Sequence, residues 1–195
     1  MRYLSLCLLL LTTTSLCAQP VRNSSKKTYA DEYRHSVTFT PFSGIVTYGY
    51  LNPGIGFDYE YMISPENGIG LHIPFAFGFA GPEQDFYDEY QHTTAYAAPG
   101  IRFHTGQGRS DVDFATGPSV LVGNIHFRPT ENYNNPGIIR DPYDYSMVGF
   151  VVDNSLNFSR KHFQFGFDVR VGTLLEMQQD SRFFIHFGMH FGGRF

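Results

Sequence analysis

The chain has 195 residues and a formal net charge of −4, which suit one domain and exclude the basic patch that nucleic acid requires. It contains 20 Phe, 13 Tyr and 20 Gly but no Trp. After the first 18 residues no segment has the unbroken apolar length of a transmembrane helix, so a helical membrane protein is excluded too.

Residues 1–18 have the pattern of a secretory signal peptide. A basic residue near the start precedes a short apolar run, and a Thr/Ser-rich stretch then leads to Ala18 at the expected cleavage point. Both cysteines, Cys7 and Cys17, lie inside this segment, so we expect a mature chain without thiols or disulfides. Lipidation of Cys17 is the alternative, but Leu16 is large where a small residue is expected.

Residues 19–34 are polar and aperiodic, and we expect a flexible tail there. Eight strand-like segments follow, because apolar and polar residues alternate with a period of two. Each segment is close to or above the roughly 9–11 residues that a tilted strand needs to cross a bilayer. We therefore predict an all-β domain over 35–195, an eight-stranded antiparallel up-and-down transmembrane β-barrel. The segments are 35–47, 53–63, 68–80, 92–104, 111–127, 144–158, 162–175 and 182–195.

The last segment shows the alternation most clearly. One face of this strand is apolar along nearly its whole length, and the opposite face carries mainly histidine and glycine and ends in Arg194. A soluble sandwich would bury the apolar face, whereas a membrane barrel turns that face toward lipid and the polar face toward the lumen. The even number of segments favours the membrane barrel. The residues on the apolar face are Phe183, Ile185, Phe187, Met189, Phe191, Gly193 and Phe195.

Two segments depart from regular alternation. In the fifth, Val122 has one parity while Ile125 and Phe127 have the other, so we predict a β-bulge around Gly123. The first is made irregular by Pro41.

The connections differ in length according to the side of the barrel. Those at 64–67, 106–110 and 159–161, which we expect on the periplasmic side, are short and rich in turn-forming residues. Of the outer ones, 81–91 and 128–143 are much longer, while those at about 48–52 and 176–181 are short. Short turns on the periplasmic side and longer loops outside are typical of outer-membrane barrels.

This pattern, with Phe195 as the last residue of an alternating strand, resembles the small outer-membrane β-barrel family of OmpA/OmpX-like eight-stranded barrels over about residues 35–195. The resemblance implies the outer membrane of a Gram-negative bacterium, reached by export with a cleaved signal peptide. It places the tail in the periplasm and outer-membrane lipid around the barrel. It also implies that Phe191 and Phe195 form an assembly signal that the barrel-assembly machinery reads.

A barrel of eight strands is just wide enough to be filled by its own side chains, so we predict a plugged lumen. Buried charges need partners, so we expect a satisfied polar network inside, in place of an apolar core. Ion or proton passage is the functional alternative for these residues. By parity the members are Asp58, Glu60, His72, Arg102, His104, Asp113, Asp168, Arg170, His186, His190 and Arg194.

Two histidines of this lumen polar network, His186 and His190, lie four residues apart on one strand. At roughly 3.3 Å per residue they are about 13 Å apart, too far to share a metal ion, and we expect no metal and no cofactor. The short turns also predict which members of the network meet. The predicted pairs are Glu60 with His72, Arg102 with Asp113, Asp168 with His190, and Arg170 with His186.

Two other functions remain alternatives. Some small barrels of this resemblance are lipid A deacylases or acyltransferases that use serine and histidine. The nearest match here is His92-Thr93-Thr94, with threonine in place of serine and no evident carboxylate to orient the base, so we predict that the chain is not an enzyme. A soluble ligand-binding barrel such as a lipocalin usually has a Trp near its first strand, and this chain has none.

The loop at 128–143 is the candidate surface contact, through Tyr133, Arg140 and Tyr143. Tyrosine and asparagine in an exposed loop suit contact with an extracellular protein or glycan. The alternative is that these tyrosines belong to the interfacial aromatic belt. We expect a structural or surface-interaction protein.

Overall fold

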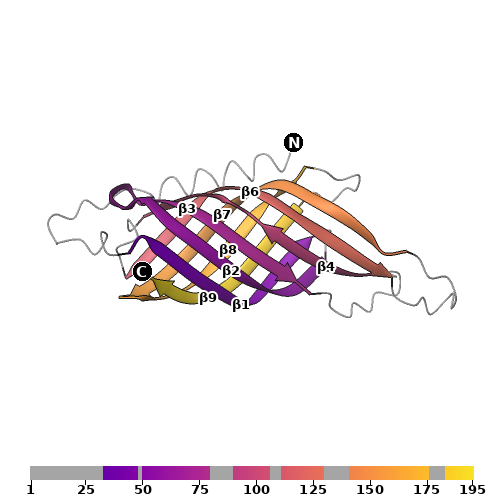
Figure 1. The fold of residues 1–195 in the computed structure, drawn as a ribbon, viewed down its shortest axis with the longest axis horizontal. Coiled ribbons are helices and arrows are strands. Elements are labelled where there is room, and N and C mark those ends of the chain that lie inside the picture. Colours follow the sequence, from indigo (N-terminus) through magenta and orange to yellow (C-terminus); the bar gives the residue numbers. More distant parts are fainter. Residues whose placement is uncertain (1–32, 48–49, 80–89, 106–110, 130–140, 176–182) are drawn as a thin grey trace.

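The structure is a computed structural model, and it describes residues 33–47, 50–79, 90–105, 111–129, 141–175 and 183–195. Its strands form one antiparallel sheet that curls into a barrel (Figure 1). A single 3₁₀ turn, η2 (Pro65–Asn67), joins β2 to β3. The strands are β1 (His35–Thr47), β2 (Tyr50–Ser64), β3 (Ile69–Gly78), β4 (Tyr90–Ala97), β5 (Gly100–His104), β6 (Val112–Pro129), β7 (Tyr143–Arg160), β8 (Phe163–Leu174) and β9 (Phe183–Arg194).

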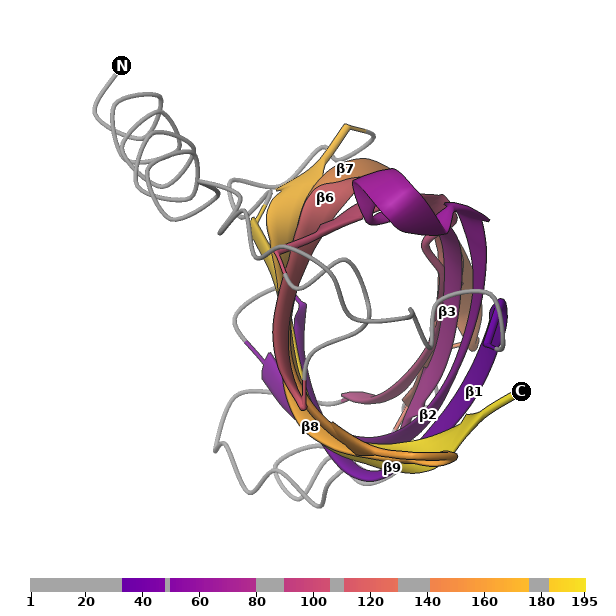
Figure 2. The same cartoon turned by 90° about the vertical axis from the view of Figure 1, so that its left-hand side faces the viewer.

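The sheet closes because the first strand pairs with the last. β1 and β9 are hydrogen-bonded from Ser36↔Arg194 to Thr47↔Phe184, and the view along the axis shows the resulting ring (Figure 2). Closure pairs both edges of the described sheet with each other, as a barrel in lipid requires. We call the end with His35 and η2 the inner end, on the left of Figure 1, and the opposite end the outer end.

The barrel has eight walls, since β4 and β5 are two halves of one strand. Both halves pair with β3 and with β6. The interruption falls at Pro99, which has no N–H to donate to a neighbouring strand. The register continues across it, because Ala97 faces Phe75 and Gly100 faces His72. The predicted eight-stranded antiparallel barrel is confirmed.

The predicted orientation of the two faces is also confirmed. Phe167 and Phe187 are 47% and 45% exposed on the outside, whereas Asp168 and His186, next to them in the chain, are 2% and 0% exposed inside. Except on β4, large apolar side chains cover the exterior of every strand, which is the surface that a transmembrane barrel presents to lipid. Among the described residues, no helix has the length and apolar character that a membrane span requires.

A β-bulge in β1 explains its irregular sequence. The pairing with β2 jumps from Thr40 to Ser43, and the pairing with β9 jumps from Phe39 to Phe42. The extra residue lets Phe39 and Phe42 face outward although their parities differ, and Pro41 in the bulge has no N–H to leave unpaired.

The bulge predicted around Gly123 is wrong. β6 pairs with β7 without interruption from Val112↔Phe158 to Phe127↔Tyr143. Ile125 and Phe127 point into the barrel and are 0% and 9% exposed, while His126 lies on the outside. The alternation inverts here because the surroundings change: the exterior becomes polar and the interior becomes apolar.

Candidate functional site

Arg170 of β8 is the centre of the lumen polar network. Its Nε donates to Asp153 of β7 at 2.6 Å, and its Nη2 donates to Asp58 of β2, on the other side of the lumen, at 2.6 Å. A third carboxylate, that of Asp168, lies 3.7 Å from Nη1. All four side chains are buried, so each charge depends on the others for compensation.

A second cluster lies nearer the inner end, around His104 of β5. The two ring nitrogens of His104 contact the carboxylates of Glu60 and Asp113. Carboxylates only accept, so this geometry suits an imidazolium that donates from both nitrogens. Arg102 joins the two clusters, with guanidinium nitrogens 3.6 Å from Glu60 and 3.6 Å from Asp153.

His190 of β9 forms a third group beside the first. Its Nδ1 lies 2.7 Å from Asp168, and its Nε2 lies 2.9 Å from the side-chain oxygen of Asn157. Gln164 donates to the same oxygen at 2.8 Å. These bonds tie β9 to both β7 and β8 from inside the barrel.

His186 of β9 lies at the boundary between the charged inner half of the lumen and the rest of the lumen toward the outer end. Its Nδ1 faces both the hydroxyl of Tyr96, at 2.6 Å, and the guanidinium of Arg170. A nitrogen that faces an arginine donor acts as an acceptor, so His186 fits this position as a neutral ring. Tyr96 packs its ring edge against Phe184 at 5.0 Å, where the apolar part of the lumen begins.

The outer half of the lumen is largely apolar and holds no buried charged residue among the described ones, although a few polar side chains such as Asn52, His92 and Thr94 also face it. This corrects the prediction of a polar network in place of an apolar core. Inward-facing aliphatic and aromatic side chains fill this half. Several of these residues lie where strands end or begin at the outer end: Leu174 is the last residue of β8 and Phe184 is the second residue of β9. The cluster consists of Ile45, Ala76, Tyr96, Ala98, Leu121, Ile125, Phe127, Met147, Val151, Leu174 and Phe184.

Three of the four predicted pairs meet. Glu60 pairs with His72 and Arg170 with His186 in the strand registers, and Asp168 contacts His190. His72 nevertheless gives its hydrogen bond to Asp58, with His72 Nε2 and Asp58 Oδ1 3.1 Å apart.

The fourth pair is wrong, since Asp113 contacts His104 and not Arg102. Phe103, beside Arg102 in the chain, pairs with Thr116, so the register of β5 on β6 differs from the predicted one.

The lumen polar network is also not fully satisfied. Arg102 Nε and Nη2, Asp168 Oδ2 and His186 Nε2 have no hydrogen-bond partner among the described residues. The sequence analysis missed Asp153, which contacts both arginines. A signal was present: polar residues alternate with apolar ones along β7, and Asp153, Ser155, Asn157 and Ser159 share the inward face.

The candidate catalytic pair lies inside the barrel. His92 and Thr94 are 5% and 2% exposed, and both face the lumen. Thr94 accepts a hydrogen bond from Asn52 at 3.3 Å, and the His92 ring stacks on Phe127 at 5.5 Å. Neither side chain faces the lipid that a lipid A-modifying enzyme would have to reach. The described residues also contain no group of three or more side chains arranged to bind a metal ion.

β6 and β7 form the longest hairpin of the barrel, with 18 residues in each strand. Near its outer end His126 and Asp144 form an exposed pair on the exterior, with Nδ1 and Oδ1 2.7 Å apart. Tyr143 is the first residue of β7, whereas Tyr133 and Arg140 lie outside the described residues.

The two residues of the predicted assembly signal face outward at the inner end. Phe191 and Phe195 are 39% and 60% exposed. The Phe195 ring stacks on His35 at 5.7 Å, and the backbones of these two residues exchange hydrogen bonds of 2.9 Å.

No family model and no curated protein matches the sequence. Several solved structures share its fold. Ail, the attachment invasion locus protein of Yersinia pestis, is 16% identical with a TM-score of 0.54, covering 84% of this chain and 99% of Ail. Neisserial surface protein A is 7% identical with a TM-score of 0.58, covering 84% of this chain and 96% of that protein.

A major outer membrane protein from Thermus thermophilus is 12% identical with a TM-score of 0.59, covering 82% of this chain and 99% of that one. Ail has also been solved in complex with the heparin analogue sucrose octasulfate. At these identities the likeness concerns the fold: the chain has the fold of the small eight-stranded outer-membrane barrels.

Proposed function

We propose that this chain is an integral outer-membrane protein that holds the β6–β7 hairpin above the membrane to contact an extracellular protein or glycan. The observation that carries the proposal is the change of polarity along the outside of this hairpin. Farther from the outer end, the outward side chains of the hairpin are apolar, as at Val120, Val122 and Phe150. Nearer the outer end they are polar, and include Asn124, His126 and Asp144.

That change marks the level at which the hairpin leaves the lipid. From Asn124 to Pro129 β6 has six more residues, which at about 3.4 Å each extend roughly 20 Å along the strand. The apolar inner face keeps the two strands together over this length, and Phe127 packs edge-on against Tyr145 at 5.7 Å. The hairpin is therefore a stiff support for the connection that contains Tyr133 and Arg140.

The filled lumen suits a supporting role better than transport. Charged side chains occupy the inner half and mainly apolar side chains the outer half, as expected for a barrel too narrow for a water-filled pore. The likeness to Ail, whose name refers to attachment and invasion, supports a surface role.

The charges on the described part of the hairpin indicate the kind of partner. His126 of β6 pairs with Asp144 of β7, and Arg128 and Asp141 add one charge of each sign, so neither sign dominates. A sulfated glycan such as the heparin analogue bound to Ail would favour a basic surface. The hairpin fits a protein or a neutral glycan better.

Cells that display the protein test this proposal. We expect them to bind to immobilised extracellular-matrix proteins or neutral glycans, and binding to fall about tenfold when residues 130–140 are replaced by a two-residue turn, because loops on rigid barrels carry recognition. The matched control shortens the β8–β9 connection at residues 176–182 and should leave binding unchanged. Equal binding by both variants, with both found folded in the outer-membrane fraction, would contradict the proposed role of the hairpin.

A further inference from the structure

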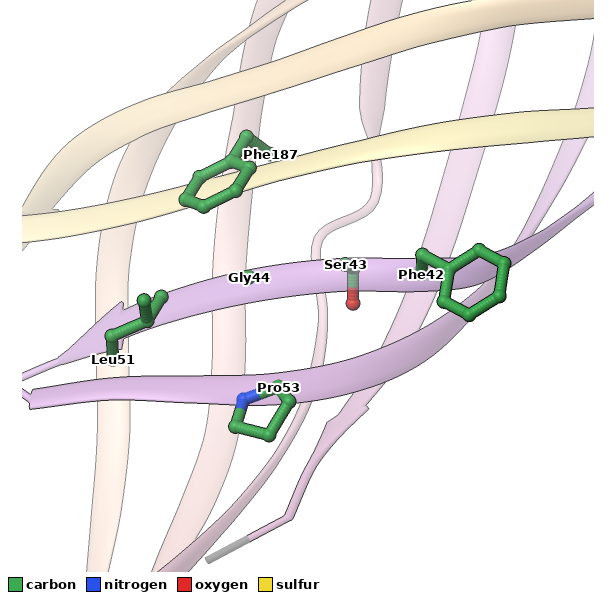
Figure 3. Close-up of a pocket in the computed structure, with 6 residues that line it drawn as sticks. All are labelled: Phe42, Ser43, Gly44, Leu51, Pro53 and Phe187. Atoms are coloured by element: carbon green, nitrogen blue, oxygen red, sulfur yellow. The ribbon is translucent and has the colours of Figure 1, made fainter. Parts of the chain in front are cut away.

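A notch interrupts the apolar exterior where β1 lies between β2 and β9 (Figure 3). It has a volume of about 310 Å³. Five of its six lining residues lack a polar side chain, and the sixth is a serine. The lining residues are Phe42, Ser43, Gly44, Leu51, Pro53 and Phe187.

The notch exists because Gly44 stands where its neighbours have side chains. Gly44 pairs with Pro53 on one side and with Phe187 on the other, so the outward row across three strands has a gap in the middle. The bulge at Pro41 turns Phe42 outward, where it is 74% exposed and forms one wall. Leu51, 52% exposed, forms another wall (Figure 3).

The tip of the Phe187 ring lies directly over Gly44, and the notch is the space that remains beside this ring. A Cβ atom on Gly44 would lie 2.3 Å from the Phe187 Cζ, so a larger residue at this position would have to displace the ring. Glycine is therefore what allows the ring to lie flat and the notch to stay open.

We propose that the notch binds one acyl chain of a bilayer lipid and retains it longer than the rest of the apolar exterior does. The notch opens onto the lipid-facing surface, so acyl chains are what surround it. Its volume is on the order of ten water-sized volumes, enough for a stretch of hydrocarbon. Walls on several sides remove more of each methylene from contact with other lipids than a flat surface does.

The proposal rests on the membrane location proposed above, and the absence of Trp from the chain gives it a clean test. One variant carries Ile55→Trp, two residues from Pro53 on the outside of β2. The other carries Val122→Trp on β6, four walls from β1 in either direction around the barrel and 43% exposed in the native chain. Dibrominated phosphatidylcholine, which quenches Trp on contact, is titrated into detergent micelles that contain each variant.

We expect half-maximal quenching of Ile55→Trp at a brominated-lipid fraction about fourfold lower than for Val122→Trp. A factor of four corresponds to about 0.8 kcal/mol, which several additional van der Waals contacts with the walls of the notch supply. Filling the notch with Gly44→Leu in the Ile55→Trp chain should bring the two titrations together. If Gly44→Leu does not give a folded, heat-modifiable barrel, Pro53→Phe is used in its place, because a larger side chain at this lining residue also fills the notch.

Each other outcome is decisive. Parallel titrations of the two reporters would overturn the notch as a site but leave the membrane assignment intact. A Val122→Trp reporter that is never quenched would contradict the lipid-facing exterior and the proposed function itself. If Ile55→Trp is protected from quenching by brominated lipid and native mass spectrometry shows dimers, the notch binds a second copy of the chain and the lipid proposal is overturned.

Discussion

The two halves of the lumen solve the same packing problem with opposite chemistry. The inner half is filled by charged and amide side chains around Arg170 and His104, and the outer half mainly by aliphatic and aromatic ones around Leu121 and Phe184. Both halves are enclosed by the same strands, so strand geometry alone does not choose between them. An enclosed lumen accepts either solution, provided that volume is filled and charge is compensated.

The halves differ in what they contribute. Apolar burial is favourable at about 25 cal/mol per Å² without regard to direction, so the outer half mainly adds stability. A buried ion pair adds little net stability but is costly to break, so the inner half mainly penalises wrong registers. Arg170, which reaches Asp153 beside it and Asp58 across the lumen, is bonded to strands that are far apart in the chain.

Among the substitutions that test this difference between the halves, removing the central cation should cause the largest loss in the free energy of unfolding. Arg170→Met would leave Asp58, Asp153 and Asp168 without their shared partner and should lower the free energy of unfolding by about 3–5 kcal/mol. Urea unfolding in lipid vesicles measures this. Arg160→Met, at the exposed inner end of β7, is the matched control and should change little. Equal effects of the two substitutions would show that the inner half is not held by its charges.

A cavity in the apolar half should cost somewhat less. Leu121→Ala removes a fully buried side chain and should lower the free energy of unfolding by about 3 kcal/mol. Leu156→Ala is the control, because Leu156 is 39% exposed on the outside and lipid can fill the space it leaves. Similar losses for the two leucines in the same urea titration would mean that the outer half is loosely packed.

How far the sequence predicts this molecule depends on which rule is used. Parity places Asp168 inside and Phe167 outside, because a strand alternates whatever its register. The error over Arg102 does not affect this assignment of faces. Pairing Arg102 with Asp113 shifts the register of β5 on β6 by an even number of residues, so every side chain stays on its predicted face but has a different partner. The compact turn around Glu66 fixes Glu60 opposite His72, whereas the sequence at 106–110 does not indicate on which residue its turn is centred.

The outer half was missed for a different reason. The inversion at Ile125 and Phe127 has the appearance of a bulge only if the exterior is lipid along the whole strand. If β6 leaves the lipid at the level we propose, His126 faces water and the apolar residues belong inside. A sequence pattern records the difference in polarity between two faces and not which face is which.

A smaller effect is expected from a single ion pair inside the lumen. His190→Ala removes one charge-assisted hydrogen bond from Asp168, which keeps Arg170 within 3.7 Å, and leaves Asn157 its bond from Gln164. We expect a loss of about 2 kcal/mol in the free energy of unfolding. His190→Gln retains a donor and should recover part of the loss. No recovery in the urea titration would indicate that the ring matters for its volume and not for its bond.

The smallest effect should come from the equivalent pair outside. His126 and Asp144 meet through the same atoms, Nδ1 and Oδ1, at the same 2.7 Å as His190 and Asp168, but the exterior pair is 46% and 61% exposed against 3% and 1% inside. Water competes for the exposed charges, so His126→Ala should change the free energy of unfolding by less than about 1 kcal/mol. Asp144→Asn, which keeps the shape of the side chain, should behave alike. A loss from His126→Ala as large as that from His190→Ala would mean that the hairpin tip is shielded from water, against the level at which we place the membrane surface.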